Sequence, residues 1–263
     1  MKNRNRTSRL IFLFLSGIAL LFIISPIISL YFSSSLDKIF ESAADPEVSQ
    51  SIITSLVIAA ATTLIFAVFA IPLAYLLARH DFKGKNLLLG FIDLPIVLPH
   101  SAAGIAVLGL ITRDSLLGRL ADSIGLNLIG SPFAIGLAMA FVSLPFLINS
   151  AKDGFEAVPK RLEQSAATLG ASPFQSFKTI ALPLAKPSII SGLVLMFARG
   201  MSEFGAVIIV AYHPMTAPVL IFDRFNSFGL SYARPISIIF VSVCVLVFIL
   251  LRLLGQKKTS RKN

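Results

Sequence analysis

Charged residues are scarce in this chain of 263 residues, and tryptophan is absent. Only 14% of the residues are Asp, Glu, Lys or Arg, whereas about a quarter is usual for a soluble domain. Hydrophobic residues make up 56% of the chain, in long runs that polar residues rarely interrupt. The scarcity of charge therefore argues against a soluble α/β protein and favours an all-α protein that crosses a membrane several times.

Cysteine and phosphate-binding motifs are scarce as well. The single cysteine, Cys244, lies in an apolar run, so it can form no intrachain disulfide and has no partner at metal-ligand spacing. A G-x-x-x-x-G-K-[ST] phosphate loop is missing, since Gly84-Lys85-Asn86 lacks both the upstream glycine and the hydroxyl residue. We therefore expect no catalytic residue, no metal site and no ATP hydrolysis by this chain alone.

Six apolar runs are long enough to cross about 30 Å of hydrocarbon as helices. Each must be helical, because lipid offers the backbone no other hydrogen-bond partner. The first run is longer than the roughly 7–15 apolar residues of a signal peptide, so we expect it to remain as a span. The predicted spans are residues 10–32, 51–77, 87–111, 132–151, 187–212 and 233–254.

The distribution of charge predicts the orientation. The net charge of +10 would suggest a nucleic-acid partner in a soluble protein. Here basic residues are in excess in both terminal tails and in segments 79–85 and 152–186, whereas the alternate loops carry little positive or a negative net charge. The positive-inside rule then places both termini in the cytoplasm. We expect one transmembrane domain, residues 1–263, in which 152–186 is the longest cytoplasmic loop.

Local signals within this loop predict two short helices joined by a sharp bend. Residues 160–169 are good helix formers, and Gly170 can adopt the left-handed conformation that ends a helix. Ser172 is then the N-cap of the next helix, with Pro173 at its first position and Gln175 closing a capping box. Such a unit is either an amphipathic helix on the membrane surface or a docking element for a cytoplasmic partner.

The loop resembles the cytoplasmic EAA motif of ABC-importer permeases, in which Glu-Ala-Ala is followed by Gly six residues after the Glu and later by Ile-x-Leu-Pro. The matching residues are Ala166, Gly170, Ile180, Leu182 and Pro183. Gln164 and Ser165 replace the Glu and the first Ala, which puts in doubt any salt bridge from that Glu. Glu163, one residue earlier, would point to a different face of the helix.

The resemblance implies that the loop docks into a separate ATPase subunit, which would bind the ATP and Mg, and that this chain binds no cofactor itself. The residues expected to couple the two subunits are Glu163, Gln164, Ser165, Ala166, Ala167, Gly170, Ala171, Ser172 and Pro173.

Charged residues within the spans are candidates for the translocation pathway, because each costs about 2.5–3.5 kcal/mol to insert. Arg199 and Glu203 lie one helical turn apart. We expect them to neutralise each other and fix helix packing. In the alternative, Arg199 faces the pathway and lowers the barrier for an anion, with Glu203 orienting it.

Asp93 begins a second polar element, and two prolines four residues apart should distort its helix. We expect Asp93 to pair with a neighbour such as Arg199, and the distorted helix to form part of a gate. The tentative pathway or gate residues are Asp93, Pro95, Pro99, His100, Arg199 and Glu203.

Two longer segments, DLPIVLPHSAAGIAVLGL from Asp93 and ARGMSEFGAVIIVAYHPMTAPVLIFDRF from Ala198, look like the molybdate/tungstate branch of the oxyanion importers. Segment 202–206 resembles an element that molybdate and sulfate permeases share, whereas 213–218 fits the molybdate/tungstate branch better. The resemblance, which covers residues 10–254, implies a multi-pass permease of the type I ABC-importer kind in a prokaryotic cell membrane. It further implies a pore between two copies of the chain and an extracytoplasmic binding protein docked on outer loops that include 212–232.

Three other functions stay open at this point. The chain resembles sulfate or thiosulfate permeases to a lesser degree. It could instead be a self-contained channel or secondary transporter, which would need no ATPase subunit. A receptor or assembly subunit that transports nothing is the third alternative, and a measurement of coupled flux would exclude it.

Overall fold

The computed structural model describes residues 2–256, and this described part consists of helices, turns and loops without a β-strand. Five of its helices are long and apolar enough to cross a membrane, and a bent pair of shorter helices adds a sixth span if counted as one. The all-α membrane fold predicted from the apolar runs is therefore confirmed.

The long helices are α1 (Lys2–Phe32), α3 (Pro46–Arg79), α7 (Pro132–Ala157), α10 (Leu182–Met201) and α13 (Leu230–Gln256). The shorter helices are α2 (Leu36–Ala44), α4 (Lys85–Val97), α5 (His100–Ile111), α6 (Leu116–Ser123), α8 (Lys160–Thr168), α9 (Pro173–Ser176), α11 (Val207–Val210) and α12 (Ala217–Phe228). A π-helical turn, Phe177–Ala181, joins α9 to α10.

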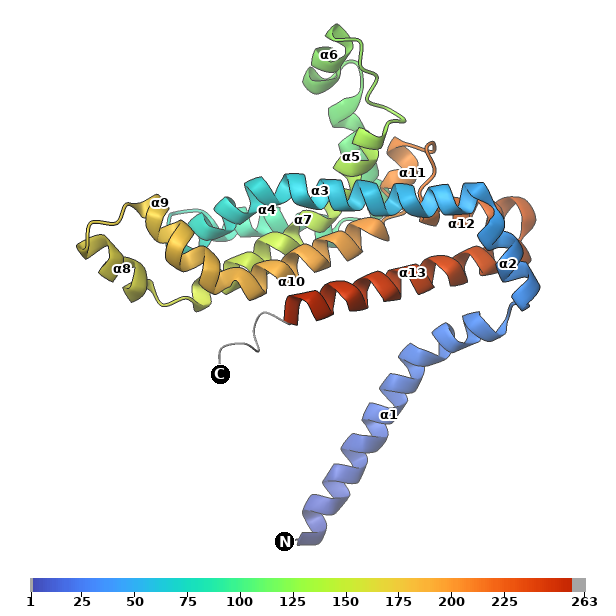
Figure 1. Cartoon of the computed structure of the whole chain (residues 1–263), viewed down its shortest axis with the longest axis horizontal. Helices are drawn as coiled ribbons and strands as arrows, with labels where there is room; N and C mark the ends of the chain where they lie inside the picture. The colour runs from blue at the N-terminus through green and yellow to red at the C-terminus, as the bar shows by residue number, and fades with distance from the viewer. Residues whose placement is uncertain (1, 257–263) are drawn as a thin grey trace. The chain divides into compact units, whose positions relative to one another are not determined.

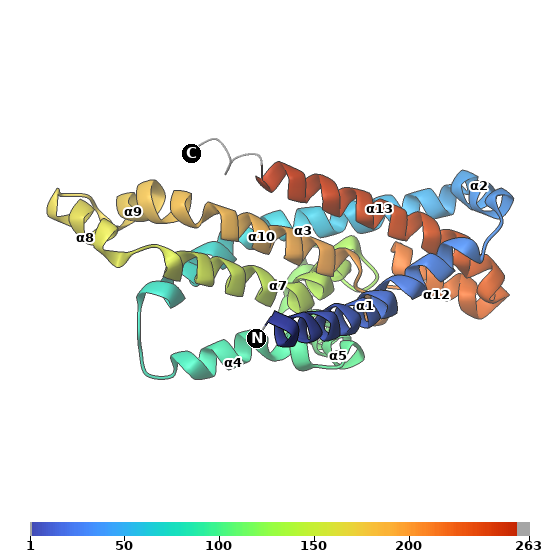
Figure 2. The same ribbon diagram turned by 90° about the horizontal axis from the view of Figure 1, so that it is seen from below.

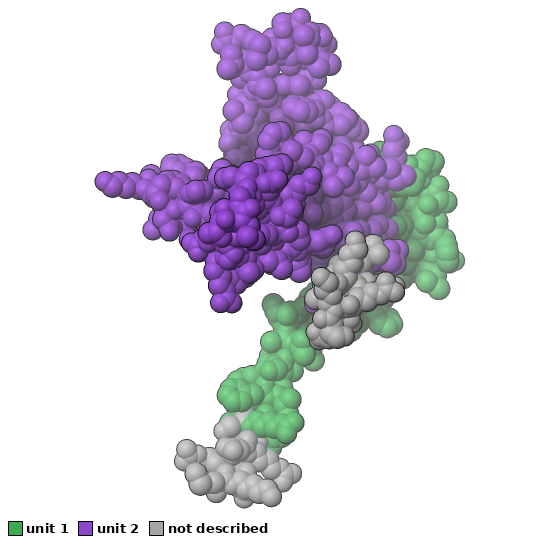
Figure 3. Space-filling model, turned by 60° about the vertical axis from the view of Figure 1, so that its left-hand side comes forward, with its two compact units in different colours: residues 1–49, 221–242 green, residues 50–220, 243–263 purple. Residues whose placement is uncertain are grey.

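The chain divides into two compact units, which Figure 3 colours separately. Unit 1 combines residues up to 49 with residues 221–242, and unit 2 combines 50–220 with the chain from 243 onward. The residues expected to form a gate and the expected coupling loop, residues 152–186, both lie in unit 2.

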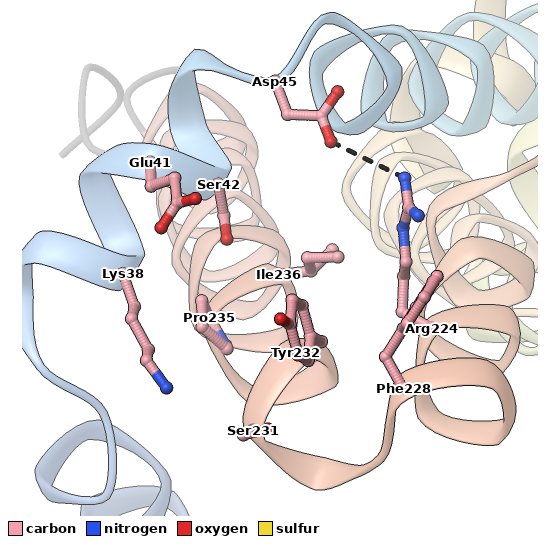
Figure 4. A pocket seen from close by; sticks show the side chains of 10 residues that line it. All are labelled: Lys38, Glu41, Ser42, Asp45, Arg224, Phe228, Ser231, Tyr232, Pro235 and Ile236. Atoms are coloured by element: carbon pink, nitrogen blue, oxygen red, sulfur yellow. Dashed lines mark ion pairs between the residues drawn. The ribbon is translucent and has the colours of Figure 1, made fainter.

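Unit 1 contains α1, α2 and the corner between α12 and α13. Gly229 forms this corner in the left-handed conformation, with φ +81°. The side chain of Arg224 forms ion pairs with Glu47 and, at 3.6 Å, with Asp45. A pocket of about 370 Å³ lies between α2 and the α12–α13 corner, lined by charged and aromatic side chains (Figure 4).

The long helices of unit 2 lie side by side, and α7 and α10 form the most extensive contact among the described helices (Figures 1 and 2). Glycines allow this close approach. A Cβ on Gly154 would lie 2.4 Å from Cβ of Ser188, and one on Gly192 would lie 3.0 Å from Cβ of Ser150. The tight packing of α7 on α10 gives the expected gate residues and the expected coupling loop a common rigid support.

The third predicted span is broken, as its two prolines indicated. α4 and α5 are bent by 113° at Leu98 and Pro99. Pro99 has no N–H to continue a helical ladder and restricts Leu98 to an extended conformation, with ψ 138°. The break places His100 at the first position of α5.

The fifth predicted span, residues 187–212, was wrong at both ends. The helix continues upstream through the π-helical turn into α9, and it stops at Met201. The wider π-helical turn contains Thr179, the residue whose carbonyl the ring of Pro183 would otherwise meet, so the helix passes the proline without ending. At the other end, the apolar residues of α11 made the run look longer than the helix is.

Two segments expected as outer loops are partly helical. The segment between the first two predicted spans contains α2, and the segment between the last two contains α12 and the start of α13. Apolarity identified only helices long enough to span, so these shorter helices carried no comparable signal.

Candidate translocation gate and coupling loop

The broken ends of two spans meet at a cluster of three polar side chains, which we call the gate cluster: His100, Arg199 and Glu203. Arg199 Nη2 lies 2.8 Å from Glu203 Oε2 and 3.1 Å from each ring nitrogen of His100. His100 Nδ1 is itself 3.4 Å from Glu203 Oε2. Arg199 and Glu203 therefore neutralise each other, as expected, and His100 is a further partner that spacing along the chain did not predict.

Exposure is divided unequally within the gate cluster. The side chain of Glu203 is only 1% exposed, whereas those of Arg199 and His100 are 25% and 52% exposed. The carboxylate is thus closed off by protein, and the cationic side of the cluster stays open. Such a site can offer hydrogen-bond donors to an anion while its own counter-charge remains fixed behind the arginine.

The backbone around the gate cluster depends on two glycines and on Glu203. Glu203 Oε1 accepts a hydrogen bond of 2.9 Å from the backbone N–H of Ala206, which stabilises the turn after α10. A Cβ on Gly205 would lie 2.6 Å from Cβ of His100, and one on Gly104 would lie 2.9 Å from the carbonyl oxygen of Ala206. The start of α5 can therefore rest directly on this turn.

Asp93 pairs with a neighbour, as expected, but that neighbour is Asn149 and not Arg199. Asp93 Oδ1 accepts a hydrogen bond of 2.6 Å from Asn149 Nδ2 on α7. The break at Pro99 explains the difference, because it leaves Asp93 on α4 and brings the first residue of α5 to Arg199 instead. Pro95 is buried within α4, and Pro99 is the N-cap of α5.

The candidate coupling loop, residues 152–186, has the predicted helix–bend–helix form. α8 ends in a turn where Gly170 has φ +88° and Ala171 N–H donates to Ala166 O over 3.0 Å. Ser172 is the N-cap of α9, and its capping box with Gln175 is complete. These local predictions are confirmed, and α8 and α9 lie beyond one end of α7 and α10 (Figure 1).

The bend of the coupling loop presents apolar side chains that the described protein does not cover. Leu169, beside Gly170, and Phe174, in the first turn of α9, are strongly exposed. Ala167 and Ser165 on α8 are also exposed, and both are small. An exposed apolar pair on a rigid bend, next to small residues, can contact a protein groove closely.

Glu163 has the most extensive polar contacts of the coupling loop. Its Oε1 lies 2.6 Å from Nη2 and accepts a 2.8 Å hydrogen bond from Nε of Arg79, at the end of α3. Its Oε2 accepts a 2.5 Å hydrogen bond from the hydroxyl of Tyr75. Arg79 Nη2 also donates to the carbonyl oxygen of Val158, after α7.

Sequence reasoning missed Tyr75 and Arg79, because it counted Arg79 only as a loop charge. The sequence did contain a signal for such a polar contact, because Tyr75 and Arg79 lie one helical turn apart at the basic end of a span. Nearby, Lys85 forms an exposed pair with Asp81 at 2.8 Å. The hydrogen bond and positive charge of Lys85 lower the pKa of Asp81 below its ordinary value.

Curated relatives match most of the chain. It is 43% identical over 255 residues to the molybdate/tungstate transport system permease protein WtpB of Pyrococcus abyssi, covering 95% of this chain and 96% of that protein. The WtpB protein of Thermococcus kodakarensis is 45% identical over 226 residues, 86% of each chain. A probable sulfate transport system permease protein of Chlorokybus atmophyticus is 33% identical over 229 residues, 84% of this chain and 80% of that one.

Solved structures agree on the fold. A chain of a bacterial ABC transporter involved in the import of the acidic polysaccharide alginate superposes with a TM-score of 0.76 at 16% identity, covering 97% of this chain and 98% of that one. The alginate transporter in complex with its alginate-bound periplasmic protein gives a TM-score of 0.77, also at 16% identity, and covers 98% of both chains. Residues 70–260 match the model of one family, and the chain belongs to it: the inner membrane components of binding-protein-dependent transport systems.

Proposed function

We propose that this chain is the membrane-spanning permease subunit of an ATP-driven importer for molybdate or tungstate. The observation that carries the proposal is the near full-length likeness to permeases named for that transport. Relatives named for sulfate are less similar, so sulfate is the second candidate substrate. All three substrates are tetrahedral dianions, which makes the gate cluster relevant to each of them.

In this proposal the gate cluster lowers the barrier for the dianion. Arg199 offers guanidinium N–H groups on its open side, and charge-assisted hydrogen bonds of this kind suit oxyanions. Glu203 holds the guanidinium from the closed side and prevents it from turning away. Asp93, with Pro95 and Pro99, shapes the broken span that carries His100 to the same place.

ATP is hydrolysed, in this proposal, by a separate subunit that binds ATP and Mg. The exposed bend of the coupling loop is the docking element, with Gly170, Ala171, Ser172 and Pro173 setting its shape. Gln164, Ser165, Ala166 and Ala167 form the remainder of the coupling segment on α8, and Glu163 fixes that helix to α3. This chain itself binds no cofactor.

Two copies of the chain enclose the pathway, because up to six spans are few for a wide path and twofold pairing is the usual solution. The transport cycle is alternating access between two states. An extracytoplasmic binding protein delivers the anion to the outer face, where segment 212–232 includes Arg224, Phe228 and Tyr232 of the unit 1 pocket.

The test is ATP-dependent uptake in proteoliposomes that contain this chain, its candidate ATPase and its candidate binding protein. Labelled tungstate or molybdate is supplied with an excess of sulfate. Uptake that needs all three components and resists sulfate is the expected result. Uptake abolished by sulfate would favour a sulfate permease, and uptake by this chain alone would overturn the ATP-driven reading in favour of a secondary transporter or channel.

A further inference from the structure

The cytoplasmic Arg79–Glu163 pair suggests a role that neither the family likeness nor the EAA spacing assigns. α8 has few ways to hold its position, because seven of its nine residues are exposed. The two exceptions are Glu163 and Ala166, and neither is fully buried. Glu163 is therefore the one acidic anchor through which α8 contacts the end of a transmembrane helix.

We infer that Glu163 and Arg79 are positioning residues, which tie the coupling helix α8 to the end of α3 so that the two move as one body. The inference rests on the proposed function, because it concerns the loop that is to dock the ATPase. When nucleotide binding moves α8, this ion pair passes the displacement to α3 directly. Without it, the movement would reach the spans through the two-residue link from α8 back to α7, and through α9 and the π-helical turn, which α8 also contacts, into α10.

The geometry of the carboxylate fits such a joint. Its two oxygens are held by different side chains on successive turns of α3, Oε1 by Arg79 and Oε2 by Tyr75. Two attachment points restrict rotation as well as separation, which a single hydrogen bond would not. Arg79 extends the network by its bond to Val158 O at the end of α7.

Aromatic packing makes the α3 side of the joint stiff. The ring of Tyr75 makes edge contacts with Phe155 of α7, at 5.3 Å between centroids, and with Phe177 of the π-helical turn, at 4.8 Å. Phe155 is fully buried. The hydroxyl that holds Glu163 therefore belongs to a ring packed between α7 and the π-helical turn that leads into α10.

The pair is poorly suited to be a device for stability alone. Both side chains are largely buried, and Arg79 Nη1 is buried without a hydrogen-bond partner. A buried pair whose hydrogen bonds are incomplete recovers little of its desolvation cost, so apolar residues would stabilise the same place equally well. Unlike apolar contacts, the ion pair fixes the orientation of α8 relative to α3.

The neighbouring residue supplies a matched control. Gln164 stands where the EAA motif has its glutamate, and its side chain is exposed on a different face of α8. If an acid anywhere at the start of α8 sufficed, Gln164→Glu would rescue Glu163→Gln. If the joint to Arg79 matters, only the exchange Arg79→Glu with Glu163→Arg can restore a partner across the same gap.

The experiment uses the reconstituted complex and measures anion uptake and ATP hydrolysis together. In Glu163→Gln we expect the ATPase to stay bound and active while the anions transported per ATP fall by about 5- to 150-fold, the usual range for coupling between sites. The charge-exchanged pair should recover part of that ratio, and Gln164→Glu should recover none. Uptake and hydrolysis that fall in equal proportion, or rescue by Gln164→Glu, would overturn the inference.

A second measurement needs no transported substrate, so it separates failure of this inference from failure of the proposed function. Spin labels are placed at two exposed residues, Arg161, which lies on α8 outside the coupling segment, and Leu76, in a chain carrying Cys244→Ser. With Glu163 present, the distance between the labels should stay single and narrow with and without nucleotide on the ATPase. In Glu163→Gln it should broaden, and an unchanged distribution would refute the joint.

Discussion

Two arginine–glutamate pairs in unit 2 differ in how far their side chains are exposed. In the coupling joint, Arg79 and Glu163 are both nearly enclosed, and the carboxylate is held from two sides. In the gate cluster, Glu203 is enclosed but Arg199 keeps an open side next to the exposed ring of His100. The same two residue types thus form an enclosed ion pair at one end of unit 2 and an open cationic site at the other.

The difference follows from what lies behind each arginine. Arg79 ends a continuous helix, where Glu163 of α8 and the carbonyl of Val158 after α7 enclose its guanidinium group. Arg199 lies in the last turn of a helix that stops at Met201, beside the break between α4 and α5. Helix breaks remove backbone that would otherwise cover a side chain, and they are the usual places for ion sites in transporters.

The largest effect should come from removing one partner of the closed pair. Arg79→Ala leaves the Glu163 carboxylate nearly buried without its cation, which typically costs about 3–5 kcal/mol. The thermal midpoint of the purified chain in detergent should therefore fall clearly. The double change Arg79→Met with Glu163→Met should recover most of this stability but not the coupling, and a single Arg79→Ala variant of unchanged midpoint would contradict the burial argument.

Removal of Arg199, the partly exposed arginine of the gate cluster, should affect transport more than folding. Arg199→Ala should lower uptake by about 10- to 100-fold, since a hydrogen bond to a charged group is worth about 1.5–3 kcal/mol. The variant Arg199→Ala with Glu203→Gln keeps the interior free of an unpaired charge, and it should assemble normally yet transport as poorly. Normal uptake by that double variant would show that Arg199 serves packing alone.

The bend of the coupling loop should give a smaller effect. Gly170→Val places a β-branched residue at φ +88°, and left-handed backbone costs a non-glycine residue about 1–2 kcal/mol. Nothing lies within 4 Å of a Cβ at this position, so the effect of the valine should come from backbone strain and not from a collision with other atoms. Hydrolysis should become partly uncoupled from uptake, whereas Gly170→Asn, which tolerates this conformation better, should stay close to normal. If uptake per ATP hydrolysed were the same in Gly170→Val and Gly170→Asn, backbone strain at position 170 could not be the cause.

Local features of the coupling loop and of the segment around the gate cluster could be predicted from the sequence. Gly170 and Ser172 act on backbone within four residues of themselves, and Pro99 breaks its own helix, so their consequences need no knowledge of the rest of the fold. The five long spanning helices followed equally from apolarity, because a bilayer sets the length of every helix that crosses it, and the sixth span is present if the bent pair α4–α5 is counted as one.

Partners far apart in the chain could not be predicted. The joint connects residues 88 positions apart, Tyr75 and Glu163, and the break at Pro99 decides that His100 and not Asp93 meets Arg199. The end of α10 was hidden for another reason. The apolar residues of α11 continue the hydropathic run, while the turn between them depends on the bond from Ala206 to Glu203.

The smallest effect should come from a third ion pair, which lies in the loop beside the joint. Lys85 and Asp81 are only 2.8 Å apart, yet the carboxylate of Asp81 is strongly exposed. Its pKa is lowered by Lys85, so any stabilisation is present above the unfolded pKa of an aspartate and is lost only as the pH falls through the lower, folded value. Asp81→Asn should therefore leave the thermal midpoint and the uptake at neutral pH unchanged, because water and salt screen such a pair. A loss comparable with that of Arg79→Ala would mean that proximity, and not enclosure, sets the worth of an ion pair in this chain, and the contrast between the closed joint and the open gate would then need another cause.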